Sequence, residues 1–306
     1  MAFSLLDYMK MLQPARAELF HSELRSAITR DSVVLDLGAG FGHFAIYAAK
    51  LGARHVFAIE TNPAVKVCKV LARKNNVADR VTVIQADSRS VKLPESVDVL
   101  IADVRGSLPF FQDSLQVIQH ACQNFLAQSG LVMPFGDDVF VCPVEYPEFA
   151  SRTMPVDFTQ FDLDYSALGV LTNSSPARTS GRETRLLSTP AKWSEVRHSY
   201  SGTDIETYPL RFQIESSGCL DGLLVWSKLL FPTGSVLNND PKGPGLPYGQ
   251  AFFPFREAGV QVDDGQEVHC DLKPMLVGRN TQWRWSADIE GKRRIENNSI
   301  VSALFG

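Results

Sequence analysis

The sequence predicts an α/β fold in which a parallel sheet covered by helices is followed by an antiparallel β domain. Apolar strands and amphipathic helices alternate from residue 31 to about residue 134, and a glycine-rich turn follows the first strand directly. After Pro134 the pattern changes to short strands separated by Pro, Gly and Asn turns. Alternating elements favour a parallel sheet with helices on both faces, whereas short strands between turn residues are typical of a β-barrel or sandwich.

These patterns divide the chain into three parts. Residues 1–30 are expected to be helical, because Leu5, Tyr8 and Met11 form an apolar stripe. Residues 31–134 are expected to form a Rossmann-like domain, and residues 135–306 a β-barrel domain. The expected strands of the first domain are 33–37, 55–60, 81–85, 97–102 and 130–134, and its helices are 42–51, 63–75 and 110–127. The clearest strands of the second are 140–144, 210–214, 222–226 and 283–287.

The glycine turn carries the strongest functional signal. It reads Asp36-Leu37-Gly38-Ala39-Gly40-Phe41-Gly42, and the next strand ends on Glu60. An acid about 20 residues past such glycines is placed to meet ribose hydroxyls in a nucleotide-binding βαβ unit. The third glycine of a dinucleotide motif is replaced by His43. An acidic residue ahead of the loop suits a ligand that brings an amino acid and a sulfonium, so we predict S-adenosylmethionine. A dinucleotide, or a plain glycine turn without ligand, is the alternative.

Composition excludes several other classes of function. The chain has 306 residues, a net charge of −4 and no basic stripe, so a nucleic-acid partner is not expected. Its five cysteines are scattered without metal-ligand spacing, which predicts reduced thiols, no metal site and a cytoplasmic location. No apolar run reaches the length of a membrane-spanning helix, so no membrane association is expected.

In its order of parts the chain resembles the protein arginine methyltransferase family. The resemblance is strongest in Val33–Glu60 and returns in Asp221–Trp226 and Phe252–Phe255. It implies a homodimer in which a polar arm at about residues 162–187 packs against a second subunit. The apolar contacts near the start of that arm would be Phe161, Tyr165, Leu168, Val170 and Leu171.

The resemblance also implies a set of donor-binding residues. In that family the donor is held by an arginine on the N-terminal helices, the glycine loop, the acid that ends the second strand, and residues after the third strand. The matching positions are Arg16, Asp36, Gly38, Gly40, Glu60, Thr61, Asp87 and Ser88.

The acceptor pocket departs from the family pattern. The family has two glutamates nine residues apart, and here Asp103 and Gln112 stand in their places. Because a guanidinium offers a planar fork of donors that suits two carboxylates, a shorter acid and a neutral amide disfavour an arginine acceptor. Asp113 is a carboxylate beside Gln112, but on a helix it would point about 100° away. The family's Thr-His-Trp loop falls on Leu246-Pro247-Tyr248.

We therefore take Asp103, Gln112 and Asp113 as candidate catalytic residues. Arg105, Tyr248 and Gln250 are candidate substrate-binding residues, and Arg105 is expected to pair with Asp103 or with an acidic group of the acceptor. Each has an ordinary structural alternative: a helix cap for Asp103, a solvated helix face for Gln112, a surface position for Arg16 and a turn for Asp87.

The leading functional hypothesis is methyl transfer from S-adenosylmethionine to a nitrogen or oxygen of a small-molecule or peptide acceptor. The first alternative is an arginine N-methyltransferase with a modified pocket. The second is a catalytically inactive scaffold that binds the donor and a protein partner.

Overall fold

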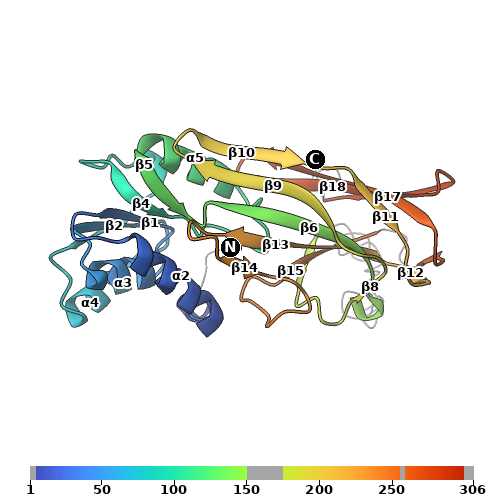
Figure 1. The fold of residues 1–306 in the computed structure, drawn as a ribbon, viewed down its shortest axis with the longest axis horizontal. Helices are drawn as coiled ribbons and strands as arrows, with labels where there is room; N and C mark the ends of the chain where they lie inside the picture. Colours follow the sequence, from blue (N-terminus) through green and yellow to red (C-terminus); the bar gives the residue numbers. More distant parts are fainter. Residues whose placement is uncertain (1–4, 150–174, 256–258, 300–306) are drawn as a thin grey trace, which may run out of the picture.

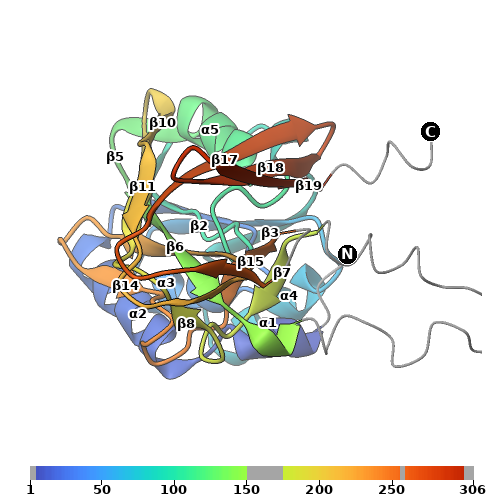
Figure 2. The same ribbon diagram turned by 90° about the vertical axis from the view of Figure 1, so that its right-hand side faces the viewer.

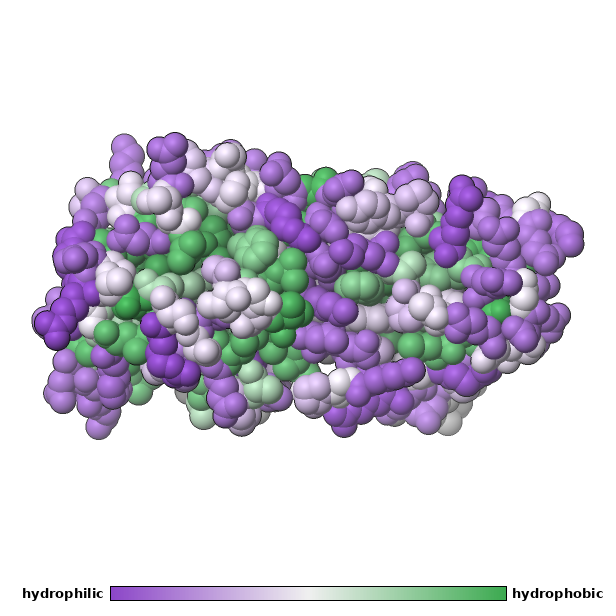
Figure 3. Space-filling model, in the orientation of Figure 1, coloured by the Kyte–Doolittle hydropathy of each residue, from purple (hydrophilic) through white to green (hydrophobic). Residues whose placement is uncertain are grey.

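A computed structural model describes residues 5–149, 175–255 and 259–299. The molecule is elongated, with the helices and the parallel sheet at one end and the long antiparallel strands at the other (Figure 1). On the face shown in Figure 3, hydrophobic residues gather mainly over the end that carries the helices. The predicted order of an α/β half followed by an antiparallel half is confirmed.

The first half is built on a five-stranded parallel sheet with the order β3-β2-β1-β4-β5. Its strands are β1 (Val33–Leu37), β2 (His55–Glu60), β3 (Val81–Gln85), β4 (Val97–Ile101) and β5 (Leu126–Met133). All five residues of β1 are buried, as a central parallel strand covered on both faces requires. The strand order reverses beside β1, between β2 and β4, and ligands of open α/β sheets bind at such a switch point, outside the carboxyl ends of the strands.

Helices cover both faces of this sheet. They are α1 (Leu5–Lys10), α2 (Pro14–Ala27), α3 (His43–Leu51), α4 (Val65–Lys74) and α5 (Ser114–Asn124). Helices α2, α3 and α4 lie on one face, and α5 lies on the other (Figure 1, Figure 2).

Residues 5–27 form two helices, because Pro14 starts a new one and the Gln13 side chain accepts from the Arg16 amide. Two expected boundaries later in the chain were wrong for local reasons. The third helix of the domain begins at Ser114 rather than residue 110, since Gln112 adopts a left-handed φ of 50° that no helix tolerates. That helix ends at Asn124, and the last parallel strand starts at Leu126 with an irregularity in its pairing to β4.

The second half is antiparallel throughout its paired strands. Its strands are β6 (Gly136–Glu145), β7 (Ala177–Thr179), β8 (Arg185–Leu186), β9 (Ala191–Ser199), β10 (Gly202–Thr207), β11 (Leu210–Gln213), β12 (Gly218–Leu220), β13 (Gly222–Leu230), β14 (Val236–Asn238), β15 (Gln250–Pro254), β16 (Val260–Val262), β17 (Glu267–Val277), β18 (Asn280–Ile289) and β19 (Arg293–Asn298). They form an eight-stranded sheet with the path β10-β9-β6-β13-β15-β7, a four-stranded sheet β11-β17-β18-β19, and the pair β12-β16. Closure of these sheets into one barrel stays a prediction.

The two halves share one hydrophobic core cluster. Phe20 on α2 is fully buried against Phe44 on α3 and against Phe231, which follows β13, with ring centroids 4.6 and 5.0 Å away. On the same helix, the Glu23 carboxylate accepts hydrogen bonds from the amide and hydroxyl of Thr233. Helix α2 is therefore held by the antiparallel half, and the domain boundary expected at residue 134 stays a prediction.

The expected dimerisation arm falls largely outside the described residues, because residues 162–174 and its five apolar contacts lie there. In the described remainder, β7 pairs with β15 and β8 pairs with β6 of the same chain. Among the described residues no helix is long and apolar enough to cross a membrane. The same described ranges hold no group of three or more His, Cys, Asp or Glu side chains that could bind a metal ion.

Acid should destabilise the fold through His198, a buried histidine on β9. Burial, aided by the charges of Arg105 and Arg197, lowers the pKa of His198 from 6.5 to about 4. The unfolded chain therefore binds a proton first, and stability falls as the pH drops from about 6.5 to about 4. In urea titrations at about pH 7 and about pH 4.5, His198→Gln should lose roughly 2 kcal/mol less stability than the wild type. An equal loss in both proteins would contradict this account.

Candidate active site

A cavity of about 450 Å³ opens at the carboxyl ends of the parallel strands. This is the edge at which open α/β sheets bind ligands, and the volume suits a nucleoside-sized molecule. Of the fourteen residues singled out from the sequence, twelve line this cavity: Arg16, Asp36, Gly38, Gly40, Glu60, Thr61, Asp87, Ser88, Asp103, Arg105, Gln112 and Asp113.

The glycine loop forms the floor of the cavity. Gly38, Gly40 and Gly42 have φ values of 71°, 56° and 86°, a region that favours glycine. A Cβ on Gly42 would lie 2.1 Å from the Cys68 sulfur, and one on Gly40 would lie 2.7 Å from the Tyr8 ring. The loop thus needs glycine both for its backbone angles and for close packing.

Asp36 on β1 is joined to the first turn of α3, across the glycine loop. Its carboxylate is buried and accepts a 2.9 Å hydrogen bond from the Ala45 amide in the first turn of α3. Burial raises the pKa of Asp36 to about 7. A ligand with a positive charge would favour the ionised carboxylate, which suits the ammonium and sulfonium of the predicted donor.

Glu60 joins the end of β2 to the glycine loop. One oxygen accepts from the Gly40 amide at 3.0 Å, and the other accepts from the Asn62 amide at 2.8 Å and the Thr61 hydroxyl at 3.1 Å. Burial and the nearby Glu60 carboxylate raise the pKa of the Tyr8 phenol. The acid is therefore fixed at the cavity wall where ribose hydroxyls are expected.

The far end of the cavity is lined by residues after β3. Asp87 accepts a 3.1 Å hydrogen bond from the Arg89 amide and so begins a short turn of 3₁₀ helix, Ser88–Ser90. The Ser88 hydroxyl is buried and finds no hydrogen-bond partner among the described residues. Because a buried polar group without a partner is costly, this hydroxyl fits a polar atom of a bound nucleoside.

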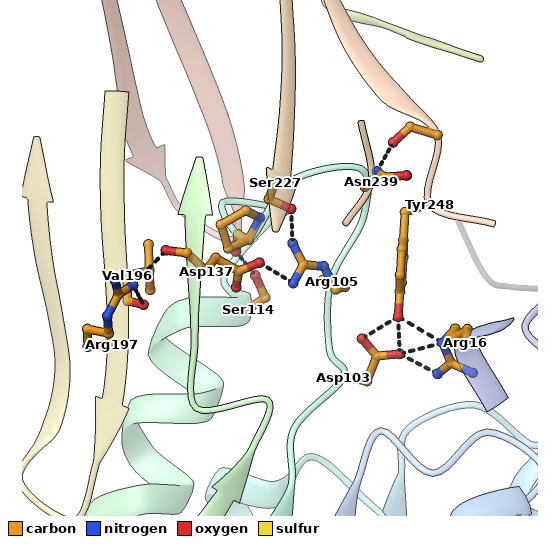
Figure 4. A network of polar contacts seen from close by, with 12 residues as sticks. Arg16, Asp103, Arg105, Ser114, Asp137, Val196, Arg197, Ser227, Asn239 and Tyr248 are labelled. Atoms are coloured by element: carbon orange, nitrogen blue, oxygen red, sulfur yellow. Dashed lines mark hydrogen bonds and ion pairs between the residues drawn. The ribbon is translucent and has the colours of Figure 1, made fainter. Parts of the chain in front are cut away.

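The other end of the cavity is closed by Arg16, Asp103 and Tyr248 (Figure 4). The Arg16 side chain ion-pairs with Asp103 through Nη2, and its Nε donates to Asp103 at 3.1 Å and to the Tyr248 hydroxyl at 2.8 Å. Tyr248 in turn donates to the Asp103 oxygens, which lie 3.0 and 2.8 Å away. Burial raises the pKa of Tyr248, so the phenol stays protonated and acts as a donor.

Aromatic rings fix the Arg16 guanidinium in place. Its central carbon lies 5.0 Å from the Phe20 centroid and 4.9 Å from the Phe44 centroid. Nη1 donates to the Met11 carbonyl at 2.6 Å. Each Nη atom still carries a second N–H, which leaves Arg16 able to hold a further acceptor in the cavity.

Arg105 pairs with Asp137 and not with Asp103. Its Nη1 is 2.5 Å from the Asp137 carboxylate on β6, and its Nη2 donates to the Ser227 hydroxyl on β13 at 2.7 Å. Its guanidinium lies 5.3 Å from the Tyr248 ring centroid. Because Arg105 and Asp137 are almost fully buried, the pair is a structural link between the two halves.

Gln112 and Asp113 lie in the turn that precedes α5. Gln112 lines the cavity in its left-handed conformation, and its carbonyl accepts from the Thr281 hydroxyl at 2.9 Å. Asp113 is buried and ion-pairs with Arg89 and Arg279. The expectation that Asp113 points about 100° away from Gln112 on a helix was wrong, because both residues precede α5.

Two predicted substrate residues stand apart from the cavity lining. Tyr248 reaches the site only through its hydroxyl, and the Gln250 side-chain nitrogen donates to the Asn239 carbonyl inside the antiparallel half. Arg279 and Asp137 were not predicted, because they lie in the β17–β18 turn and on β6, which only the folded topology brings to the cavity.

Comparisons with known proteins agree with this geometry. Residues 6–123 match the model of the TRM5/TYW2 methyltransferase domain. Over 89% of this chain and 79% of the relative, the sequence is 22% identical to protein arginine N-methyltransferase 1 of Saccharomyces cerevisiae. Protein arginine N-methyltransferase 6 of Xenopus tropicalis is 24% identical over 82% of this chain and 76% of the relative. The chain is therefore an S-adenosylmethionine-dependent methyltransferase that is similar in sequence to protein arginine methyltransferases.

One further relative matches only part of the chain, and two solved structures have a similar fold. Protein arginine N-methyltransferase 2 of Dictyostelium discoideum is 28% identical over half of this chain, which spans 30% of that relative. The Trypanosoma brucei PRMT1 enzyme-prozyme complex with AdoHcy has a TM-score of 0.81 at 19% identity, covering 95% of this chain and 97% of that one. Arabidopsis thaliana protein arginine methyltransferase 10 has a TM-score of 0.79 at 17% identity, covering 97% and 98%. The predicted cofactor of this methyltransferase, S-adenosylmethionine, is therefore confirmed over a dinucleotide.

Removing the charge of Glu60 should weaken donor binding by about tenfold or more, because the ribose hydroxyls would lose an ionised partner in a closed site. Equilibrium dialysis of Glu60→Gln with labelled S-adenosylmethionine measures this. The matched control is Glu95→Gln, a partly exposed acid paired with Arg54 away from the cavity. Equal affinities in the two variants would remove Glu60 from the donor site.

Proposed function

We propose that this methyltransferase acts on an uncharged nitrogen or oxygen of a small-molecule or peptide acceptor. The observation that carries the proposal is that Asp103, the carboxylate at the proposed acceptor position, is already bound by neighbouring side chains. Both of its oxygens are engaged by Tyr248, and one of them also by Arg16. Since its charge is already balanced and Gln112 is neutral, the pocket offers a cationic acceptor little stabilisation.

The residues present fit the donor along the whole cavity. Arg16, with its remaining N–H groups, would hold the amino-acid carboxylate, and Glu60 would accept from the ribose. Asp87 and the Ser88 hydroxyl, which has no other partner among the described residues, would meet the nucleobase. When bound, S-adenosylmethionine supplies a methyl group on a sulfonium that is open to in-line attack.

The chain's own side chains would align the acceptor and exclude water. Asp103 Oδ1 accepts one hydrogen bond, from Tyr248, so it retains a lone pair for an acceptor N–H or O–H. Met11, Val104 and Phe111 also line the cavity and give this end an apolar wall. Positioning and desolvation of this kind supply much of the rate enhancement when the reaction needs little other help.

Replacing the Asp103 carboxylate should slow turnover by more than it weakens donor binding. In Asp103→Asn we expect donor affinity weaker by about tenfold, because Arg16 loses its ion-pair partner. Turnover at saturating donor should be lower by about 10²-fold, the scale of a lost acid–base or orienting group. The acceptor is first found by screening metabolites and peptides with labelled donor. Asp204→Asn, an exposed carboxylate on β10, is the control. Unchanged turnover would move the proposed role to another residue.

Arginine N-methylation with a modified pocket is the second candidate, and the named relatives favour it. Our proposal predicts weak or absent methylation of histone-tail and Gly-Arg-rich peptides, because Asp103 and Gln112 stand where two carboxylates would be needed. Mass spectrometry of peptides incubated with protein and donor decides the matter. Robust mono- or dimethylarginine would replace the leading proposal with this one.

Three further statements stay proposals. A homodimer is supported by the similar fold of a trypanosomal protein described within a heterotetramer. A cytoplasmic location is supported by the five unpaired cysteines. An inactive donor-binding scaffold is the third functional candidate, and it predicts donor binding without turnover on any acceptor.

A further inference from the structure

The hairpin of β17 and β18 reaches from the antiparallel half to the donor cavity. Its two-residue turn, Gly278 and Arg279, joins paired residues Val277 and Asn280. Gly278 has a φ of 62° at the first turn position, which is typical of the tight turns that match strand twist. So short a turn fixes the backbone of Arg279, whose side chain lines the cavity.

Two residues attach this hairpin to the cavity wall. Arg279 Nε donates to the Asp113 carboxylate at 3.0 Å, and its Nη2 lies 3.5 Å from Asp87. The Thr281 hydroxyl donates to the Gln112 carbonyl at 2.9 Å. The hairpin therefore touches both segments that border the nucleoside end, the turn after β3 and the turn before α5.

The charges at this end are arranged as an alternating set of two acids and two arginines. Arg89 contacts Asp87 at 2.7 Å and Asp113 at 2.9 Å, and Arg279 bridges the same two carboxylates. The Asp113 side chain is only 9% exposed, so its charge depends on these partners. The Asp87 pKa is lowered to about 2, with its hydrogen bond to Arg89 as the main cause.

A purely structural role for Arg279 is the simpler alternative. Its side chain is 66% exposed, and exposed ion pairs contribute little to folding stability. The same contact has more effect on a ligand, because it sets where two carboxylates of the cavity wall can lie. A purely structural role would leave donor binding independent of the hairpin, whereas a role in positioning the two carboxylates makes donor binding depend on it.

We propose that Arg279 is a positioning residue that couples the β17–β18 hairpin to the donor site. It holds Asp87 and Asp113 in the geometry that receives the nucleoside, so docking of the hairpin and binding of the donor favour each other. This inference rests on the proposed donor site. By thermodynamic reciprocity, bound donor must stabilise the hairpin as much as the hairpin stabilises bound donor.

The test compares three variants of the full chain with S-adenosylhomocysteine as the probe. Arg279→Ala should weaken binding about fivefold, the upper range for an exposed charge pair. Arg279→Lys should recover part of this loss, because one ammonium can contact Asp113 but cannot bridge to Asp87. Arg284→Ala, an exposed arginine of the same hairpin, should bind like wild type. Thermal midpoints of all three should match wild type.

Hydrogen exchange provides the second readout. The probe should slow amide exchange in residues 277–281 of the wild type and of Arg284→Ala, and have little effect there in Arg279→Ala. If the wild type binds the probe and Arg279→Ala binds it with equal affinity, the coupling is overturned and the donor site stands. The same conclusion follows if the wild type binds the probe but amide exchange in its hairpin does not change. No binding by the wild type would overturn both.

Discussion

The ion pair between Arg16 and Asp103, closed by the Tyr248 hydroxyl, is the contact on which the site depends. Its three members come from α2, from the segment after β4 and from the loop before β15. All three are buried or nearly so, and a buried charge without its partner is strongly destabilising. The position of α2, and with it one end of the cavity, is therefore set by a residue of the antiparallel half.

The same contact explains why the two ends of the cavity differ in chemistry. The proposed nucleoside end keeps free hydrogen-bonding capacity at the Ser88 hydroxyl. The proposed acceptor end has its one carboxylate, Asp103, committed to Arg16. A site of this kind can hold a polar, partly charged donor while receiving an acceptor that brings no strong positive charge. The relation to arginine methyltransferases thus describes the scaffold and the donor better than it describes the acceptor.

The sequence predicted those features that short contiguous patterns of residues encode. The glycine loop, Glu60 and the apolar strands are contiguous patterns, and the structure places them as expected around one cavity. It did not predict the partner of Arg105, because Asp137 lies on a strand whose neighbours depend on the order of the whole antiparallel sheet. The start of α5 was also missed, since the left-handed conformation of Gln112 is imposed by its surroundings and not by its own preference.

The most direct test of this account is a calorimetric titration of the wild type and of Tyr248→Phe with S-adenosylhomocysteine. The account predicts one saturable site per chain in the wild type and affinity weaker by about tenfold in the variant, because Arg16 and Asp103 lose a shared buried hydrogen bond. Absence of binding by the wild type up to millimolar concentration, or equal affinity in both proteins, would contradict the claim that a contact across the two halves builds the donor site.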